Sequence, residues 1–320
     1  MPKYCVTGGS GFIASYLVKT LLEQGHSVKA TVRNPGDAKK VGFLWEFDGA
    51  RERLELVKAD LMQDGSFDDA IEGVDGVFHA ASPVTLDYDD NVQKTLVEPA
   101  IRGTENVLNS CAKSKTVKRV VLTSSCSTVR YRDDAEQVSP LNESHWSDID
   151  YCKRNKLWYA YSKISGEKEA WRIAAEKGID LVVVHPSLVI GPLLSPEPTS
   201  TLLMALNIIK GVSGEYPNMK IGFVHIEDVV AAHILAMEKR EASGRLICSG
   251  AVAHWSEVIE MLKAKYPAYP YATKCDDRVG DNIEHRMDTS KLAKLGFPPL
   301  KTIEEMFDDL VKSCQVKGFL

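Results

Sequence analysis

Short apolar runs alternate with longer helical stretches along the first 186 residues, and this alternation limits the possible folds more than any other feature. Runs rich in β-branched residues occupy residues 3–7, 27–33, 54–60, 76–81, 119–125 and 181–186, with helical stretches at 12–24, 91–114 and 157–177. Segments such as VVL and LVVV lack polar alternation, which is typical of strands buried on both faces. Repeated strand–helix–strand units favour a parallel sheet covered by helices on both sides. We therefore expect an α/β protein with a Rossmann-type, doubly wound parallel sheet.

The pattern changes after Pro186. A proline-rich stretch, GPLLSPEPTS, fills residues 191–200, and helices are expected near 200–210, 228–239, 255–265 and 302–315, with few strands. We interpret residues 1–186 as a dinucleotide-binding domain and residues 187–320 as a smaller, mostly helical substrate-binding part, some of whose strands or helices can return to the first domain. Ligands of open α/β sheets bind at the carboxyl ends of the strands, so the second part should close over that edge.

A glycine-rich segment, TGGSGFIA, follows directly after the first expected strand. Its Gly8 and Gly11 would let the backbone turn tightly and approach a pyrophosphate, and Ala14 replaces the third glycine of the usual fingerprint. The helix that begins at Phe12 and Ile13 would offer unpaired N–H groups and a partial positive charge to that phosphate. This placement between a strand and a helix predicts a dinucleotide site, with a plain turn as the alternative.

The end of the second expected strand selects the cofactor. An acidic residue there would accept the ribose 2′-hydroxyl of NAD, whereas basic residues would bind the 2′-phosphate of NADP. The chain has Arg33 at that end, with Lys39 and Lys40 on the next turn, and Asp37 is the only nearby acid. We therefore predict NADP(H), with a solvated basic surface as the alternative.

Two other strand ends should contribute to the same cofactor site. Asp60 and Leu61 follow the third strand and are placed to contact the adenine ring. Ala80, Ala81 and Ser82 follow the fourth strand, and we expect backbone contacts from them near the cofactor, in preference to chemistry by His79.

The segment LWYAYSK combines two tyrosines with one lysine in an expected helix. Tyr159 and Lys163 are four residues apart and share a helix face, whereas Tyr161 lies roughly 200° around the helix from Lys163. Ser124 and Ser125 end the fifth strand, whose end should face the same cleft.

A Tyr–Lys pair of this kind supports proton transfer. The phenol of tyrosine has an ordinary pKa of about 10, and a nearby ammonium lowers it. Tyr159 would then protonate a carbonyl oxygen as hydride reaches its carbon, with a serine hydroxyl holding that oxygen. The sequence thus predicts a catalytic Ser/Tyr/Lys set, with ordinary helix-surface residues as the alternative.

Composition limits the partners. The net charge of −5 gives no reason to expect nucleic acid or an anionic membrane, and no apolar run approaches the roughly 18–20 residues that span a bilayer. The seven cysteines form no CxxC pair and the eight histidines lack ligand spacing, so no metal site is expected. We expect reduced thiols in a cytoplasmic protein, a small-molecule substrate, and a monomer or weak homodimer.

Several motifs together resemble a known superfamily. TGGSGFIA, VFHAAS, VVLTSS, YAYSK and HPSLVIGP are similar to the extended short-chain dehydrogenases/reductases. TVRNP, KADL, GSFDDAI, GTENVL, NESHWSD and FVHIEDV resemble the plant dihydroflavonol reductase and cinnamoyl-CoA reductase family, and the likeness covers nearly the whole chain. VGFLWEF, STVRYRDD and PTSTLLM resemble its tetraketide α-pyrone reductases and cinnamyl-alcohol-dehydrogenase-like reductases.

The resemblance implies roles for individual residues. The catalytic set would be Ser125, Tyr159 and Lys163, the NADP phosphate contacts Arg33 and Lys40, and the nicotinamide neighbours Pro186 and Ser187.

The resemblance also implies NADPH-dependent reduction of a hydroxycinnamaldehyde or a tetraketide pyrone. Cinnamoyl-CoA reductases carry NWYCYGK, whereas this chain has Ala160 and Ser162 in place of the cysteine and glycine. Dihydroflavonol reductases carry an asparagine where this chain has Arg130. Both activities remain alternatives, as does a sugar-nucleotide epimerase that retains NAD.

Arg130, Tyr131 and His225 have two interpretations each. Arg130 and Tyr131 would contact the substrate together with Ser125, or they would be exposed loop residues. His225, in FVHIEDV, is predicted to be a buried histidine that caps the following helix, although the chain returns there toward the cleft.

Overall fold

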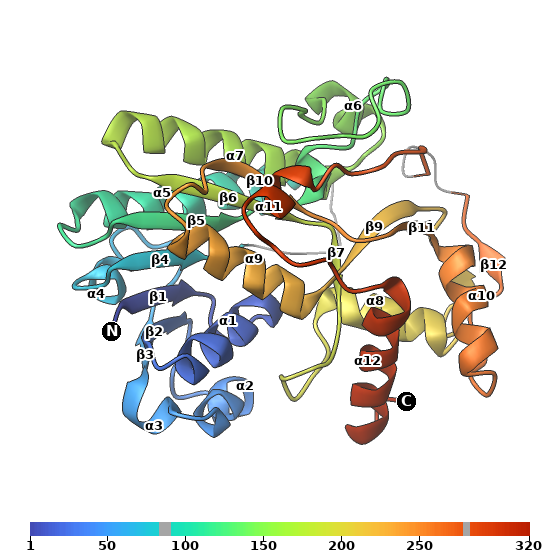
Figure 1. The fold of residues 1–320 in the computed structure, drawn as a ribbon, viewed down its shortest axis with the longest axis horizontal. Helices are drawn as coiled ribbons and strands as arrows, with labels where there is room; N and C mark the ends of the chain where they lie inside the picture. The colour runs from blue at the N-terminus through green and yellow to red at the C-terminus, as the bar shows by residue number, and fades with distance from the viewer. Residues whose placement is uncertain (83–90, 278–281) are drawn as a thin grey trace.

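The computed structural model describes residues 1–82, 91–277 and 282–320, which are built around a seven-stranded parallel sheet (Figure 1). The strand order is β10-β6-β5-β4-β1-β2-β3, and every neighbouring pair in it runs parallel. These strands are β1 (Lys3–Thr7), β2 (Ser27–Val32), β3 (Leu54–Lys58), β4 (Gly76–His79), β5 (Arg119–Thr123), β6 (Leu181–Pro186) and β10 (Gly244–Cys248). The order reverses between β1 and β4, and such a switch point is where doubly wound sheets bind their ligands. The Rossmann-type fold predicted from the alternation is confirmed.

Helices cover both faces of this sheet. One face carries α1 (Phe12–Glu23) and α9 (Ile226–Glu238), and the other carries α4 (Asp68–Ile71), α5 (Glu98–Lys113) and α7 (Trp158–Lys177). A π-helical turn, Gln93–Val97, leads into α5. Shorter helices are α2 (Ala38–Val41), α3 (Ala50–Arg53), α6 (Ile149–Arg154) and α11 (Ser290–Lys294).

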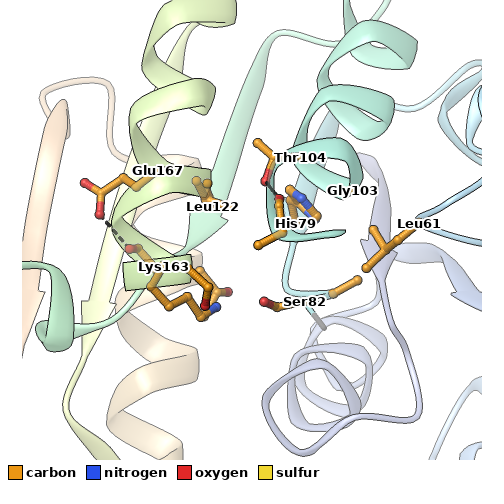
Figure 2. A pocket seen from close by; sticks show the side chains of 14 residues that line it. Leu61, His79, Ser82, Gly103, Thr104, Leu122, Lys163 and Glu167 are labelled. Carbon is orange, nitrogen blue, oxygen red and sulfur yellow. Dashed lines mark hydrogen bonds between the residues drawn. The ribbon is translucent and has the colours of Figure 1, made fainter. Parts of the chain in front are cut away.

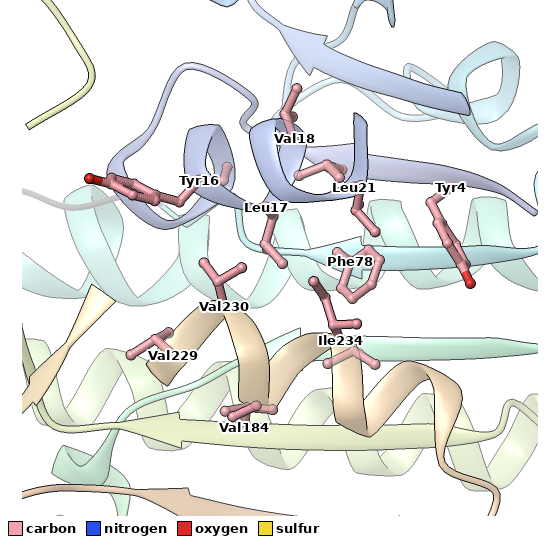
Figure 3. Packing of buried hydrophobic residues seen from close by; sticks show 14 of the residues in the cluster. Tyr4, Tyr16, Leu17, Val18, Leu21, Phe78, Val184, Val229, Val230 and Ile234 are labelled. Carbon is pink, nitrogen blue, oxygen red and sulfur yellow. The ribbon is translucent and has the colours of Figure 1, made fainter. Parts of the chain in front are cut away.

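Alternate residues of each strand enter the two halves of the core. Val121 packs toward α1 and α9, whereas its neighbours Val120 and Leu122 pack toward α5 and α7. Figure 3 shows Leu17 and Leu21 of α1 meeting α9 beside the sheet. Burial of each such side chain contributes about 1.5–3 kcal/mol to the stability of the folded state. This gain explains why these strands show no polar alternation.

The part after Pro186 contains more strands than expected. Six strands lie there among the described residues: β7 (Leu188–Ile190), β8 (Glu215–Tyr216), β9 (Lys220–His225), β10, β11 (Val252–His254) and β12 (Lys274–Cys275). β11, β9 and β7 form a small second sheet, and β12 pairs with β8. Most of these strands are too short to show a strand pattern, and β10 carries Arg245 in its interior, which hid its place in the central sheet.

Helices α8 (Ser200–Ile209), α10 (Trp255–Lys265) and α12 (Ile303–Val316) complete the C-terminal part. They lie with β9 and β11 beyond the carboxyl ends of the central strands (Figure 1). Their positions match the helices expected near 200–210, 255–265 and 302–315, and α9 matches the one near 228–239. The division of the chain at residue 186 stays a prediction.

Several expected strands end one or two residues early. Arg33, Ala80, Ala81, Ser124 and Ser125 all leave the sheet and enter loops at its carboxyl edge. The residues proposed for binding and catalysis therefore gather where the ladder hydrogen bonds stop.

All seven cysteines are free thiols, and six of them are buried. Within the described ranges, no helix is both long and apolar enough to cross a bilayer.

Candidate active site

The first turn of the fold is tight because of its glycines. Gly8 has a φ of +71°, and a Cβ added to it would stand 3.1 Å from Ala81. A Cβ on Gly9 would stand 2.8 Å from the Cβ of Ala30, and the Gly9 N–H donates to the Thr31 carbonyl at 2.8 Å. Only glycines permit β1, β2 and the end of β4 to approach so closely here.

The start of α1 fits a phosphate. Gly11 caps this helix without a side-chain hydrogen bond. In the part of the chain that the structure describes, the N–H groups of Phe12 and Ile13 make no hydrogen bond. Unpaired N–H groups at a helix start, next to backbone that a Cβ would obstruct, suit the pyrophosphate of a dinucleotide.

The basic residues after β2 are exposed at the same edge. Arg33 is exposed, and no ion pair is described for it. Lys40 lies in α2 and pairs loosely with Asp37, at 3.9 Å between the charged atoms. The only acid in this loop therefore faces a lysine, so the local charge stays positive.

The segment after β3 is held by two hydrogen bonds. The Asp60 carboxylate accepts from the Met62 N–H at 2.8 Å and closes a turn, and the Leu61 carbonyl accepts from Asn106 at 2.8 Å. The Leu61 side chain reaches the helix α5 at Gly103.

His79 has a structural role at the end of β4. Its Nδ1 lies 2.9 Å from the Thr7 hydroxyl oxygen, which also accepts from the Ala81 N–H at 3.0 Å. Burial, assisted by the charge of Lys163, lowers the pKa of His79 to about 3, so the ring is neutral and orders the Ala80–Ser82 backbone.

A narrow pocket opens between these strand ends and the helices α5 and α7 (Figure 2). Leu61, Ala81, Ser82, Ser124 and Lys163 are among its lining residues. The structure thus brings together residues from four separate segments of the chain.

Helix α7 places Tyr159 and Lys163 on one face. The Lys163 Nζ lies 5.9 Å from the centre of the Tyr159 ring. Tyr161 faces elsewhere: its ring contacts Lys153 at 4.7 Å, and its hydroxyl donates to Gln93 at 3.3 Å. Burial lowers the pKa of Lys163 to about 8, although the Glu167 carboxylate raises it in part.

The two serines after β5 have different environments. Ser124 is buried and its hydroxyl donates to Glu167 at 2.6 Å. Ser125 is half-buried and its Oγ accepts from the Ser127 N–H at 3.1 Å, at the start of a short turn, Cys126–Thr128. Among the described contacts the Ser125 hydroxyl hydrogen is donated to no group, so this serine can donate to a ligand.

Arg130 and Tyr131 are not exposed, so the exposed-loop interpretation is wrong. Only 5% and 8% of their surfaces are accessible, and the Arg130 guanidinium lies 4.0 Å from the centre of the Tyr131 ring. Arg130 also donates to the Lys220 carbonyl at 3.0 Å and to the Tyr131 hydroxyl. Neither residue lines the narrow pocket, and their contact with substrate stays a prediction.

Pro186, Ser187 and His225 lie near the start of the C-terminal part. Pro186 is buried at the end of β6, and the Ser187 N–H donates to Cys248 at 3.1 Å. His225 is fully buried and its Nδ1 accepts from the Glu227 N–H at 3.1 Å, which confirms its predicted role as the cap of α9.

One group of residues near the site was missed by sequence reasoning. Glu167, His185 and Arg245 form a buried ionic cluster beside Ser124. The only signal in the sequence was that Glu167 follows Lys163 by four residues and therefore shares its helix face.

Comparison with known proteins shows the family of the chain. Residues 4–247 match the model of the NAD dependent epimerase/dehydratase family. The chain belongs to this family. Because relatives and solved structures that match it over nearly their whole length are named as reductases, it is an oxidoreductase of the extended short-chain dehydrogenase/reductase group and a reductase that uses a nicotinamide cofactor.

Several plant reductases are similar to the chain over nearly its whole length. The chain is 64% identical to tetraketide alpha-pyrone reductase 2 of Arabidopsis thaliana over 100% of both chains. It is 46% identical to cinnamoyl-CoA reductase 1 of Petunia hybrida, over 99% of this chain and 93% of that one.

Solved structures show the same fold. Vestitone reductase from alfalfa superposes with a TM-score of 0.83 at 36% identity, over 100% of both chains. Gre2 of Candida albicans in complex with NADPH superposes with a TM-score of 0.82 at 25% identity, over 99% of both chains.

Proposed function

We propose that the protein reduces a ketone on a tetraketide α-pyrone to an alcohol, with NADPH as the hydride donor. The observation that carries this proposal is the Tyr159–Lys163 pair, because Lys163 lines the same pocket as Ser124, the neighbour of Ser125. The 64% identity to a protein named as a tetraketide alpha-pyrone reductase supports the substrate class.

Each member of the set has a defined part in the reaction. Tyr159 donates the proton to the carbonyl oxygen, and the ammonium of Lys163 favours the phenolate that remains. Ser125 donates its hydroxyl hydrogen to the same oxygen and orients the carbonyl. A reduced nicotinamide, when bound, supplies the hydride.

The preference for NADPH rests on the loop after β2. Arg33 and Lys40 are both exposed there, and a 2′-phosphate would pair with them, whereas a free ribose hydroxyl would find only Asp37, which already faces Lys40. The NADPH bound in the Gre2 complex supports the same choice.

A hydroxycinnamaldehyde is the second candidate substrate, since the same stretches of sequence resemble cinnamyl-alcohol-dehydrogenase-like reductases. Ala160 and Ser162 stand against a CoA thioester, and Arg130 stands against a dihydroflavonol.

The test is NADPH oxidation, followed by absorbance, with four substrates: a tetraketide α-pyrone, a hydroxycinnamaldehyde, a hydroxycinnamoyl-CoA and a dihydroflavonol. We expect the highest kcat/KM with the pyrone and a lower value with NADH than with NADPH. A higher kcat/KM with any other substrate would refute the substrate assignment. Stoichiometric NAD retained through purification would indicate an epimerase instead.

A further inference from the structure

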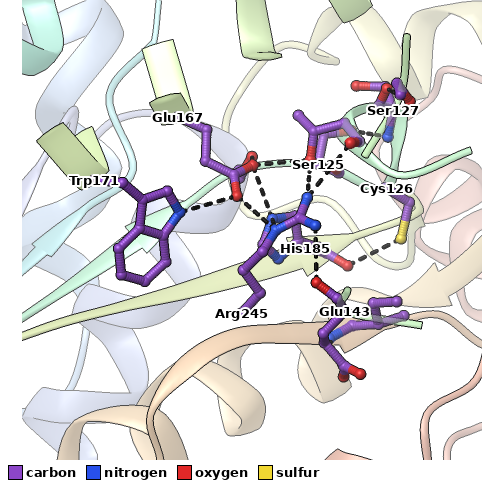
Figure 4. Close-up of polar contacts among 12 residues, drawn as sticks. Ser125, Cys126, Ser127, Glu143, Glu167, Trp171, His185 and Arg245 are labelled. Atoms are coloured by element: carbon purple, nitrogen blue, oxygen red, sulfur yellow. Dashed lines mark hydrogen bonds and ion pairs between the residues drawn. The ribbon is translucent and has the colours of Figure 1, made fainter. Parts of the chain in front are cut away.

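A single buried carboxylate joins three elements around the site. Glu167, on α7, is 2% exposed and accepts hydrogen bonds from Ser124 at 2.6 Å and Thr128 at 2.8 Å. It also accepts from His185 of β6 and from Arg245 of β10, each at 2.8 Å (Figure 4). Helix α7, the loop after β5 and the edge of the sheet therefore meet at this side chain.

Stability alone does not account for this cluster. Burial raises the pKa of Glu167, but His185, Arg245 and Ser124 outweigh it, so the pKa falls below its ordinary range and the carboxylate is charged. A buried ion pair is often no more stabilising than apolar side chains of equal volume, because both ions lose their hydration. What such a pair adds is a defined geometry.

The hydrogen bonds to Glu167 fix the backbone around Ser125. Ser124 precedes it, and the Thr128 hydroxyl oxygen lies 3.0 Å from the Ser125 carbonyl oxygen as well as 2.8 Å from Glu167. The carboxylate thus holds the chain on both sides of Ser125.

The same carboxylate belongs to the helix that carries the other two catalytic groups. Glu167 follows Lys163 by four residues and Tyr159 by eight, so all three share one face of α7. The path from Ser125 to Tyr159 passes through the peptide bond to Ser124, one hydrogen bond from Ser124 to Glu167, and two turns of helix.

We propose that Glu167 is a positioning residue, which sets the place of Ser125 relative to Tyr159 and Lys163. This inference rests on the proposed function, because the distance matters only if the three groups act on one carbonyl. Effects of this kind are large: a misplacement of about 1 Å can lower a rate about a hundredfold.

The charge of Glu167 also acts on Lys163. The titratable groups that face Lys163 are Tyr159 and Glu167 on its own helix and His79 at the end of β4. Of these, Glu167 is the one that raises the Lys163 pKa, against the larger effect of burial. Replacing Glu167 by a neutral residue should therefore move the alkaline limb of the pH–rate profile to lower pH.

The experiment removes the links to Ser125 one at a time. Ser124→Ala deletes one hydrogen bond to Glu167, and Thr128→Val deletes another together with the bond that the Thr128 hydroxyl accepts from Arg245 at 2.9 Å. Both substitutions leave the ion pair between Glu167 and Arg245 in place. We expect kcat for NADPH-dependent reduction to fall about tenfold in each, with KM and the Kd of NADPH within about twofold of the unsubstituted protein.

The matched control is Trp171→Phe. It removes a 3.4 Å hydrogen bond to the same carboxylate from a residue with no described link to Ser125, so kcat should change less than about twofold. Glu167→Gln adds the pH readout, and its alkaline limb should move to lower pH.

The outcomes separate the two proposals. If the unsubstituted protein reduces a carbonyl and both Thr128→Val and Ser124→Ala retain full kcat, the positioning role is refuted and the function stands. A fall in kcat that is accompanied by lower thermal stability and weaker NADPH binding also refutes the positioning role. That result would indicate a purely structural role. If the unsubstituted protein does not oxidise NADPH with any of the carbonyl substrates, the proposed function is refuted and so is the positioning role.

Discussion

Replacing Lys163 by methionine should abolish activity and at the same time stabilise the fold. Lys163, on α7, is half-buried near the ends of β4 and β5, and burial lowers its pKa from 10.5 to about 8. Lys163 therefore binds its proton less tightly in the native state than in the unfolded chain. Methionine has a similar length and no charge to bury.

The magnitude follows from proton linkage. Each unit of pKa difference is worth about 1.4 kcal/mol, so a shift from 10.5 to about 8 costs the native protein about 3 kcal/mol at pH 7. This is an upper value, because the partly exposed ammonium keeps some contact with water. The sign is clear: between pH 8 and 10.5 the unfolded chain retains the proton that the native state has lost, so stability rises with pH. The cost should fall to about 2 kcal/mol at pH 9.

Urea-induced unfolding without cofactor measures the effect. At pH 7 the Lys163→Met variant should be more stable than the unsubstituted protein, and the difference should shrink at pH 9. Lys168→Met, an exposed lysine on the same helix, is the matched control and should change stability by less than about 1 kcal/mol. A Lys163→Met variant that is no more stable at pH 7, or whose advantage is unchanged at pH 9, would refute the reasoning.

Three further substitutions test the remaining parts of the site. Tyr159→Phe removes the proton donor and should lower kcat by about 10²–10⁴-fold in steady-state assays, with NADPH binding unchanged. Replacing Arg33 and Lys40 together by alanine should raise the Kd of NADPH about 10–100-fold in fluorescence titrations but leave that of NADH nearly unchanged. Gly9→Ala places a Cβ 2.8 Å from that of Ala30, and calorimetry should show a loss of about 1–3 kcal/mol.

Each of these substitutions has a control. Tyr161→Phe should keep kcat within about threefold, and a larger loss there than at position 159 would contradict the helical-face argument. Lys39→Ala should weaken the binding of NADPH less than the double substitution of Arg33 and Lys40 does. Equal losses of affinity for NADPH and NADH in the double variant would contradict the phosphate assignment. Gly42→Ala meets no atom within 4 Å and should be tolerated.

Local patterns in the sequence were enough to predict much of the fold. β1 and β6 were predicted with their observed ends, and α1 and α7 to within a residue. Such features depend on neighbouring residues: the apolar run of a buried strand, the helical period, and glycines that permit a turn. The pairing of Tyr159 with Lys163 belongs here too, because four residues of helix determine which side chains share a face.

Tertiary structure decided what depends on distant residues. Residue patterns alone did not distinguish Ser124 from Ser125, and only the family resemblance pointed to Ser125. In the structure the two serines differ because Glu167, 43 residues from Ser124, accepts the hydroxyl hydrogen of Ser124. The interior position of Arg245 made β10 unreadable as a central strand, yet Glu167, 78 residues away, supplies the charge that allows it to be buried there. A buried charge is tolerated only with its partner in place, and the order of strands in the sheet, rather than any local pattern, determines which partner that is.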